Sequence, residues 1–189
     1  MYLLKNQERN EFFMKFWFVR HMETEFNRKD LFSGCTDISI LNPPSTKTME
    51  ALTALKVKLP EKFDYYVCSD LRRTSETLKH IFPDVTPIIC PYIREVNYGV
   101  WEGKEKSSVG KRLRKALQKG IFAPSGAEKN EEVVSRINAF FEYCKSTFPA
   151  DATIFVVTHA GFMRVLTREL GVPCPKGNLS YFSYAITTQ

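Results

Sequence analysis

Two of the three histidines in this sequence follow short segments that are apolar and rich in β-forming side chains. His21 comes directly after residues 16–20, and His159 comes directly after residues 154–158. Apolar runs of this length and composition are typical of buried strands. Because the carboxyl ends of parallel strands form the ligand crevice of an open α/β sheet, we expect the two imidazoles to lie close together despite their separation in the chain.

Two arginines can join the histidines at that edge of the sheet. Arg20 precedes His21, and Arg73 lies shortly after another predicted strand, residues 65–68. Guanidinium groups bind phosphate oxygens in a bidentate manner. The helix that should open at Gly161 would add backbone N–H groups and the positive end of its dipole. Two histidines, two arginines and a helix N-terminus therefore predict a site for a phosphoryl group.

Other phosphate-handling and metal chemistries lack their motifs here. The sequence contains neither the Walker-A glycine loop nor the H-E-x-x-H zinc motif. No cysteine is followed six positions later by an arginine, which a cysteine phosphatase loop requires. Acidic residues do not cluster near strand ends, so a carboxylate magnesium site is not indicated. We therefore expect a site that needs no metal and no cofactor, because side chains supply its positive charge.

Length and composition indicate one globular domain. The chain has 189 residues, of which 43% are apolar, enough for a single hydrophobic core. Five scattered cysteines fit neither a disulfide framework nor a zinc ribbon, which favours a reducing compartment. No run approaches the roughly 18 apolar residues of a membrane span, and charged residues near the N-terminus argue against a signal peptide. We expect a cytoplasmic protein.

The net charge of +6 allows nucleic acid, anionic membrane or small anionic metabolites as partners. Seven of the basic residues fall within residues 104–119. We interpret this segment as a solvated helix face, with a basic lid over an anion site as the alternative. No aromatic residue is interleaved there, which argues against a base-stacking surface. We expect a small phosphorylated metabolite as partner, with inorganic phosphate as product and with neither nucleic acid nor membrane; a homodimer is left open.

Strands and helices alternate along the chain, which predicts an α/β three-layer sandwich with a mostly parallel sheet and helices on both faces. The predicted strands are residues 16–19, 65–68, 88–90, 153–158 and 181–186, with 88–90 at an edge. The predicted helices are residues 46–58, a helix capped by Ser69 or Asp70 that ends near His80, residues 131–148, and a helix that ends near residue 170. Residues 1–13 are predicted to be an N-terminal extension, and residues 14–189 a single catalytic domain.

Five segments match a known set of motifs, in the same order along the chain. Residues 19–27 (VRHMETEFN) match R-H-G-E-T-x-x-N, residues 69–77 (SDLRRTSET) match S-x-L-x-R-A-x-x-T, and residues 94–103 (REVNYGVWEG) match R-E-x-x-x-G-x-W-E-G. Residues 125–128 (SGAE) loosely match G-G-E-S, and residues 158–164 (THAGFMR) match S-H-G-G-x-x-R. Together they resemble the histidine phosphatase superfamily, in its phosphoglycerate-mutase-like branch.

The resemblance implies a role for each matching position. His21 would be the nucleophile that takes the phosphoryl group, and Glu95 the acid that protonates the leaving alkoxide and later activates water. A neutral imidazole can attack phosphorus without prior deprotonation, whereas an alkoxide leaving group requires a proton. The catalytic set is completed by Arg20, Arg73 and His159. The phosphate-binding or substrate-binding set is Arg20, Asn27, Ser33, Arg73, Tyr98, His159 and Gly161.

Two glycines of the motifs are replaced in this chain. Met22 follows the predicted nucleophile, where its side chain could crowd the pocket or change the backbone angle. Ala160 follows His159 in the same way. These departures affect the expected fit of the substrate more than the chemistry.

The spacing of the motifs favours a compact phosphatase over a mutase. Mutases of this family carry a long insertion after the acid motif, whereas the segment from Glu95 to His159 is short here. The sequence therefore predicts a metal-independent phosphomonoester hydrolase that forms a phosphohistidine, similar to alpha-ribazole phosphatases or broad-specificity small-metabolite phosphatases. The alternatives are a cofactor-dependent phosphoglycerate-type mutase and a non-catalytic relative that binds a phosphorylated ligand.

Overall fold

A five-stranded sheet forms the centre of the molecule. A computed structural model of the chain describes residues 12–108, 110 and 126–188. The strands lie in the order β3-β2-β4-β1-β5, and only β5 runs antiparallel to its neighbour. Their bounds are β1 Phe12–Arg20, β2 Tyr65–Cys68, β3 Ile88–Ile89, β4 Thr153–Thr158 and β5 Tyr181–Thr188. The predicted edge position of the third strand is confirmed.

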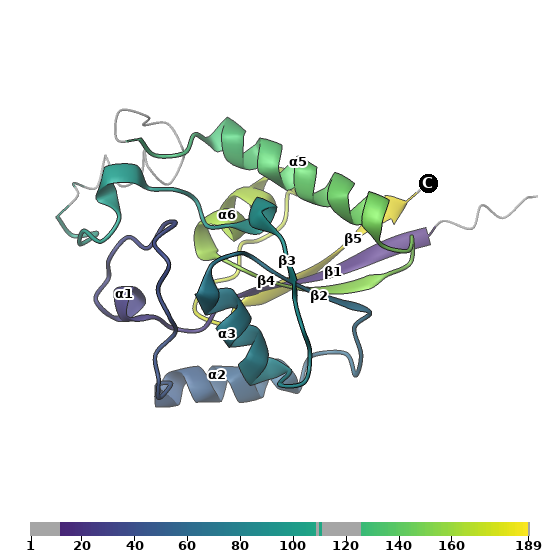
Figure 1. The fold of residues 1–189 in the computed structure, drawn as a ribbon, viewed down its shortest axis with the longest axis horizontal. Helices are drawn as coiled ribbons and strands as arrows, with labels where there is room; N and C mark the ends of the chain where they lie inside the picture. Colours follow the sequence, from purple (N-terminus) through teal and green to yellow (C-terminus); the bar gives the residue numbers. More distant parts are fainter. Residues whose placement is uncertain (1–11, 109, 111–125, 189) are drawn as a thin grey trace, which may run out of the picture.

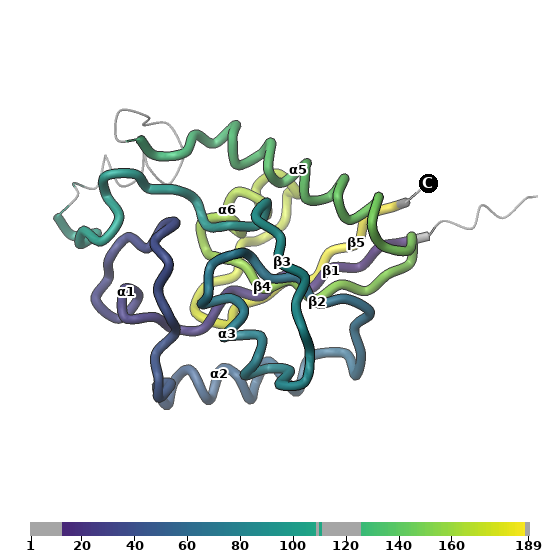
Figure 2. The backbone as a smooth tube through the Cα atoms, in the orientation of Figure 1, coloured from purple at the N-terminus to yellow at the C-terminus, as the bar shows by residue number. Residues whose placement is uncertain are grey.

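Helices cover both faces of this sheet. Among the described residues, the α-helices are α1 Glu25–Arg28, α2 Thr46–Lys56, α3 Arg72–Ile81, α5 Asn130–Thr147 and α6 Ala160–Glu169, and two short 3₁₀ helices span Pro91–Ile93 and Gly99–Trp101. Figure 1 shows α5 and α6 on one side of the strands and α2 and α3 on the other, and the tube in Figure 2 follows the same layers. The predicted three-layer α/β sandwich is confirmed.

The pleat of the strands divides the core into two clusters. Successive side chains of a strand point to opposite faces. In β1, Phe16 and Phe18 are fully buried with Phe140 on the α5 side. Val19 instead packs on the α2 and α3 side, together with Leu55. The strands that lead into the site are therefore buried on both faces, which explains their continuous apolar sequence.

Most predicted ends of strands and helices differ from the structure by one or two residues, and two larger differences have a structural reason. Strand β1 begins at Phe12 rather than at residue 16, because β5 pairs with it in antiparallel register along its length. The prediction that Ser69 or Asp70 caps the third helix is wrong, since Leu71 is the N-cap of α3 and has no side-chain cap bond. The Ser69 and Asp70 side chains are bonded to His159 and Arg94 instead.

Several features of the sequence lie outside the described residues. They include residues 1–11 of the predicted extension, Ser125, and most of the basic segment: Lys111, Arg112, Arg114, Lys115 and Lys119. Within the part of the chain that the structure describes, no helix has the length and apolar character needed to cross a bilayer.

The register of two central strands sets the position of the site. Strands β1 and β4 run parallel, with Arg20 opposite Thr158 in the last pair of the ladder. A histidine directly follows the last residue of each of these two strands. The two histidines therefore leave the sheet at the same level and from adjacent strands.

Candidate active site

The imidazoles of His21 and His159 lie side by side at the carboxyl edge of the sheet. Their ring centroids are 5.2 Å apart, and the ring planes meet at 58°. Both side chains are almost completely buried, with 2% of His21 and none of His159 exposed. The predicted convergence of the two histidines is confirmed.

The hydrogen bond of His21 determines which ring nitrogen can react. Its Nδ1 lies 2.6 Å from the carbonyl oxygen of Met22. A carbonyl oxygen only accepts, so Nδ1 carries the proton and Nε2 keeps its lone pair. Burial, followed by the charges of Arg73 and Arg20, holds the pKa of His21 well below its usual value of 6.5. The side chain is therefore a neutral imidazole with a free Nε2, the form that can attack phosphorus.

His159 adopts the opposite tautomer. The Nε of Arg73 donates to its Nδ1 at 3.2 Å, so the ring proton is on Nε2, which donates to the Ser69 hydroxyl at 2.7 Å. Burial, followed by the charge of Arg73 and then that of Arg20, holds the pKa of His159 well below its usual value of 6.5. From the sequence, Ser69 is predicted only as a helix cap. Its position directly after β2, the other neighbour of β4, is the signal that could have identified this contact.

Arg73 connects the histidines to the loop of residues 33–37. Its side chain is fully buried, and its two terminal nitrogens donate to the carbonyl oxygens of Thr36 and Gly34, each at 2.7 Å. Since Nε donates to His159, all three guanidinium nitrogens have protein partners. Arg73 orients His159 and the loop in this structure, and its remaining N–H groups are those that could bind a phosphoryl oxygen.

Arg20 has an unsatisfied donor beside His21. Its Nε is buried and has no hydrogen-bond partner among the described residues. Burial lowers the pKa of Arg20 from its usual value, while the negative charge of Glu95 opposes that shift. Leaving a buried donor unpaired costs about 1–3 kcal/mol. An anion bound at this position would remove that cost.

The Glu95 carboxylate occupies the N-terminus of α6. It accepts from the backbone N–H groups of Val96 at 2.9 Å, Phe162 at 3.0 Å and Gly161 at 3.1 Å. The N–H groups that were predicted to bind phosphate are therefore bonded to the predicted acid, which the helix dipole also favours. A Cβ atom at Gly161 would lie 2.4 Å from Glu95 Oε1, which explains why glycine is required here.

Tyr98 and Arg164 pack against this acid. The Tyr98 hydroxyl oxygen would be 3.2 Å from a Cβ atom at Gly161, and the phenol is hydrogen-bonded to Arg164. Burial, reinforced by the charge of Glu95, raises the pKa of Tyr98 to about 12, so the phenol keeps its proton near neutral pH. Arg164 is not among the site residues predicted from the sequence, although it is the last residue of the segment THAGFMR.

The Met22 side chain does not enter the site. It is 1% exposed and packs in the core cluster with Leu52 and Leu55 of α2. Its backbone N–H donates to the Thr77 hydroxyl at 2.9 Å, and its carbonyl accepts from His21. The residue that replaces glycine after the predicted nucleophile therefore leaves the pocket uncrowded and fixes the orientation of the imidazole.

Asn27 and Ser33, both predicted to bind phosphate or substrate, lie in different surroundings. Asn27 lines a cavity that also reaches Arg20, while its Oδ1 accepts from the Thr24 backbone in the cap of α1. Ser33 is half-buried, and its carbonyl accepts from the backbone N–H of Thr36. Asn27 thus faces the same space as Arg20, whereas Ser33 belongs to the loop that Arg73 anchors.

Glu102 has a structural role in that loop. Its carboxylate accepts from the backbone N–H groups of Cys35 and Thr36, both at 2.8 Å, and from the Thr36 hydroxyl at 2.7 Å. Gly34 has φ of +50°, and a Cβ atom there would lie 1.9 Å from Glu102 Oε1. Glu102 therefore holds the loop of residues 33–37, whereas the Glu95 carboxylate lies at the N-terminus of α6, directly after His159. This position makes Glu95 the better candidate for the acid.

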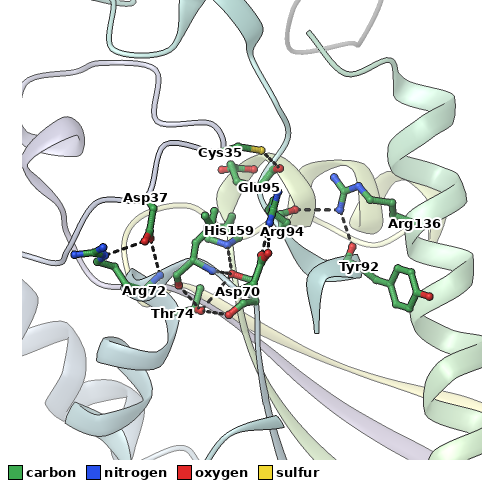
Figure 3. A network of polar contacts seen from close by, with 12 residues as sticks. Cys35, Asp37, Asp70, Arg72, Thr74, Tyr92, Arg94, Glu95, Arg136 and His159 are labelled. Atoms are coloured by element: carbon green, nitrogen blue, oxygen red, sulfur yellow. Dashed lines mark hydrogen bonds and ion pairs between the residues drawn. The ribbon is translucent and has the colours of Figure 1, made fainter. Parts of the chain in front are cut away.

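Ion pairs lie close to His159 and Glu95, as Figure 3 shows. Arg72, on the first turn of α3, bonds to Asp37 through its Nε at 2.9 Å and its backbone N–H at 2.8 Å. Asp70 accepts from two nitrogens of Arg94, the residue before Glu95. Arg72 is therefore engaged at the surface, which leaves Arg73 as the arginine that reaches the histidines.

The two buried histidines should make stability depend on pH. In the unfolded chain each imidazole takes up a proton below about pH 6.5, whereas the folded protein keeps it neutral. The free energy of unfolding should therefore fall as pH drops from 6.5 to 5, by up to about 1.4 kcal/mol per pH unit for each histidine. Urea denaturation at a series of pH values measures this slope. The slope should be shallower for His159→Gln, because this variant lacks one of the two buried imidazoles.

Comparisons with known proteins agree with this geometry. The profile of the histidine phosphatase superfamily (branch 1) matches residues 16–186. A 2,3-bisphosphoglycerate-dependent phosphoglycerate mutase of Bartonella bacilliformis is 27% identical over 80% of this chain and 79% of its own length. An adenosylcobalamin/alpha-ribazole phosphatase of Salmonella typhimurium is 25% identical over 89% of this chain and 85% of its own.

A solved structure shows the same fold. The crystal structure of phosphoglycerate mutase from Thermus thermophilus superimposes with a TM-score of 0.71 at 28% identity, covering 92% of each chain. The family profile spans the elements that carry both histidines, both arginines and Glu95. The chain belongs to the histidine phosphatase superfamily.

Proposed function

We propose that the protein is a metal-independent phosphomonoester hydrolase that acts on a small phosphorylated metabolite through a phosphohistidine at His21. The observation that carries this proposal is the bond from His21 Nδ1 to the Met22 carbonyl, which leaves Nε2 unprotonated beside Arg20 and Arg73. A buried, neutral imidazole next to two cations is suited to attack an anionic phosphate ester.

The reaction proceeds in two balanced steps. In the first, the Nε2 lone pair of His21 forms a bond to phosphorus, the ester P–O bond breaks, and protonated Glu95 gives its proton to the leaving oxygen. In the second, Glu95 as carboxylate takes a proton from water, whose oxygen attacks phosphorus. The N–P bond breaks, and inorganic phosphate leaves with His21 neutral again. The Met22 carbonyl stabilises the positive charge that the ring acquires.

The second step distinguishes the alternatives. In a mutase a substrate hydroxyl replaces water, and relatives of both kinds match this chain at similar identity. The short segment between Glu95 and His159 favours the hydrolase. A Met22 side chain that crowded the pocket would favour the non-catalytic alternative, but this side chain packs in the core cluster with Leu52 and Leu55. The five cysteines are unpaired, which fits a reducing compartment, and we place the protein in the cytoplasm.

Phosphate release in the presence of a metal chelator tests the proposal. We expect wild-type protein to hydrolyse para-nitrophenyl phosphate and glycerol 3-phosphate. For each substrate, the rate with EDTA should equal the rate without it. ³¹P NMR of 3-phosphoglycerate separates release from migration, and release should be the faster process. Loss of activity in EDTA would contradict the proposal, and migration faster than release would establish the mutase.

The close approach of Gly161 to Glu95 gives a further prediction. Gly161→Ala should push the carboxylate away from the N-terminus of α6, because the new Cβ atom would lie 2.4 Å from Oε1. We expect kcat for glycerol 3-phosphate to fall by about tenfold, a part of what a positioned acid contributes. Ala160→Gly, one residue earlier, is the matched control and should change kcat less than twofold. If kcat of Gly161→Ala stays within twofold of wild type, as expected for the control, the position of Glu95 does not matter for the reaction.

A further inference from the structure

A cavity of about 430 Å³ opens from Arg20, on the side of Asn27 and the N-terminus of α2. This volume lies within the range of small-ligand pockets, about 300–1,000 Å³. Separate segments of the chain contribute its basic residues, which are Arg20, Lys47, Lys106 and Lys176. A smaller adjoining cavity of about 280 Å³ shares Arg20 and Lys176 and adds Arg164. Both cavities thus start at the arginine that flanks the nucleophile.

The positive charge of this cavity is not balanced by its wall. Neither Lys47 nor Lys176 forms an ion pair with any described residue. Lys106 pairs with the exposed Asp30 at 2.7 Å. Glu23 is the one carboxylate among the described residues of the wall, and the Ser45 hydroxyl donates to it at 2.8 Å. The cavity therefore has an excess of positive charge available to a ligand.

The larger cavity next to Glu95 is different. Its volume is about 670 Å³, and it contains Arg94 and Arg136. Arg94 is bonded to Asp70, and Arg136 to both oxygens of Glu128. Bidentate pairs satisfy these guanidinium groups. The uncompensated positive charge near His21 is thus concentrated on the Arg20 side.

We propose that the cavity lined by Arg20, Lys47, Lys106 and Lys176 binds a second anionic group of the substrate. Lys47 and Lys176 would determine the preference for substrates that carry this group. The substrates would be small phosphomonoesters that also carry a carboxylate or a second phosphate. The inference rests on the proposed function, because it assumes that the phosphoryl group lies at His21. Ammonium groups attract an anion as point charges, and exposed ones are screened by salt. The preference should therefore be expressed mainly in KM and should weaken at high ionic strength.

Matched esters test this specificity. 3-Phosphoglycerate differs from glycerol 3-phosphate in carrying a carboxylate instead of a hydroxymethyl group, and glycerol 1,3-bisphosphate carries a second phosphate. Wild-type protein should release phosphate from at least one of these doubly anionic esters with a kcat/KM about tenfold above that of glycerol 3-phosphate. The ester with the higher value identifies the second group as a carboxylate or a phosphate. The preference should shrink in concentrated KCl.

The lysine variants locate the effect. Lys47→Gln and Lys176→Gln should each reduce the preference by about threefold through KM, and the double variant should abolish it while kcat for glycerol 3-phosphate is unchanged. Lys56→Gln is the matched control, because Lys56 is an exposed lysine of the same helix, α2, that does not line the cavity. Equal kcat/KM for all three esters, or a preference that persists in the double variant, would overturn the inference.

Binding measurements separate this result from the test of the proposed function. The His21→Asn protein cannot form the phosphohistidine, so calorimetric titration with the three esters gives Kd without turnover. Tighter binding of an ester with a second anion, lost in the lysine double variant, would support the inference even if no phosphate is released. Absence of release from all three esters by wild-type protein would instead count against the hydrolase.

Discussion

His21→Ala should lower phosphate release from every ester by about 10⁴-fold or more, the usual consequence of removing a nucleophile. The reason is that Nε2 of His21 is the unprotonated ring nitrogen, while both nitrogens of His159 are engaged by Arg73 and Ser69. Steady-state hydrolysis of para-nitrophenyl phosphate measures the loss. Because His21 is buried, circular dichroism and thermal unfolding should accompany the kinetics.

The matched control is His80→Ala, which removes the exposed histidine at the end of α3. We expect its kcat/KM to remain within twofold of wild type. A folded His21→Ala protein that retains more than one hundredth of wild-type activity would show that another group accepts the phosphoryl group.

Glu95→Gln should slow alkyl phosphates far more than aryl phosphates. Glycerol 3-phosphate needs a proton on its leaving oxygen, and we expect its kcat to fall by about 10² to 10⁴. Para-nitrophenol leaves as a stable anion, so the first step on its phosphate ester should be nearly unaffected. Pre-steady-state bursts of para-nitrophenolate isolate that step from the later attack of water, which also uses Glu95.

Glu102→Gln provides the contrast within the same segment. Its carboxylate holds the backbone of Cys35 and Thr36, so the change should loosen the loop that Arg73 anchors. We expect similar losses on alkyl and aryl esters from this variant. Equal losses on the two esters in Glu95→Gln as well would remove the acid role from Glu95.

The main features of the fold were predictable because they depend on local patterns. Apolar runs end at His21 and His159, and the register of β1 and β4 places both rings at one edge, 5.2 Å apart. Strand β4 has the predicted limits because its side chains are buried on both faces. Strand β1 is longer than predicted because its outer part is stabilised by β5, a partner that the local sequence of β1 does not reveal.

The contacts within the site could not be predicted in this way. The contact between Glu95 and the N-terminus of α6 joins residues that are distant in the chain. The sequence indicates this contact only through the glycine at position 161, where a side chain would collide with Glu95. Arg73 was predicted to face the phosphoryl group, but two backbone carbonyls compete for its terminal nitrogens. The lysines at positions 47 and 176 lie in segments without a motif, so only the folded chain places them near Arg20.

The position of the phosphoryl group on the enzyme tests the central claim most directly. Protein quenched during turnover of ³²P-labelled ester should carry an acid-labile label on the peptide that contains His21, and NMR of the phosphoenzyme should assign phosphorus to Nε2. Nδ1 is excluded in the mechanism because it donates to the Met22 carbonyl. A label on His159, on Nδ1 of His21 or on a non-histidine residue would contradict the mechanism.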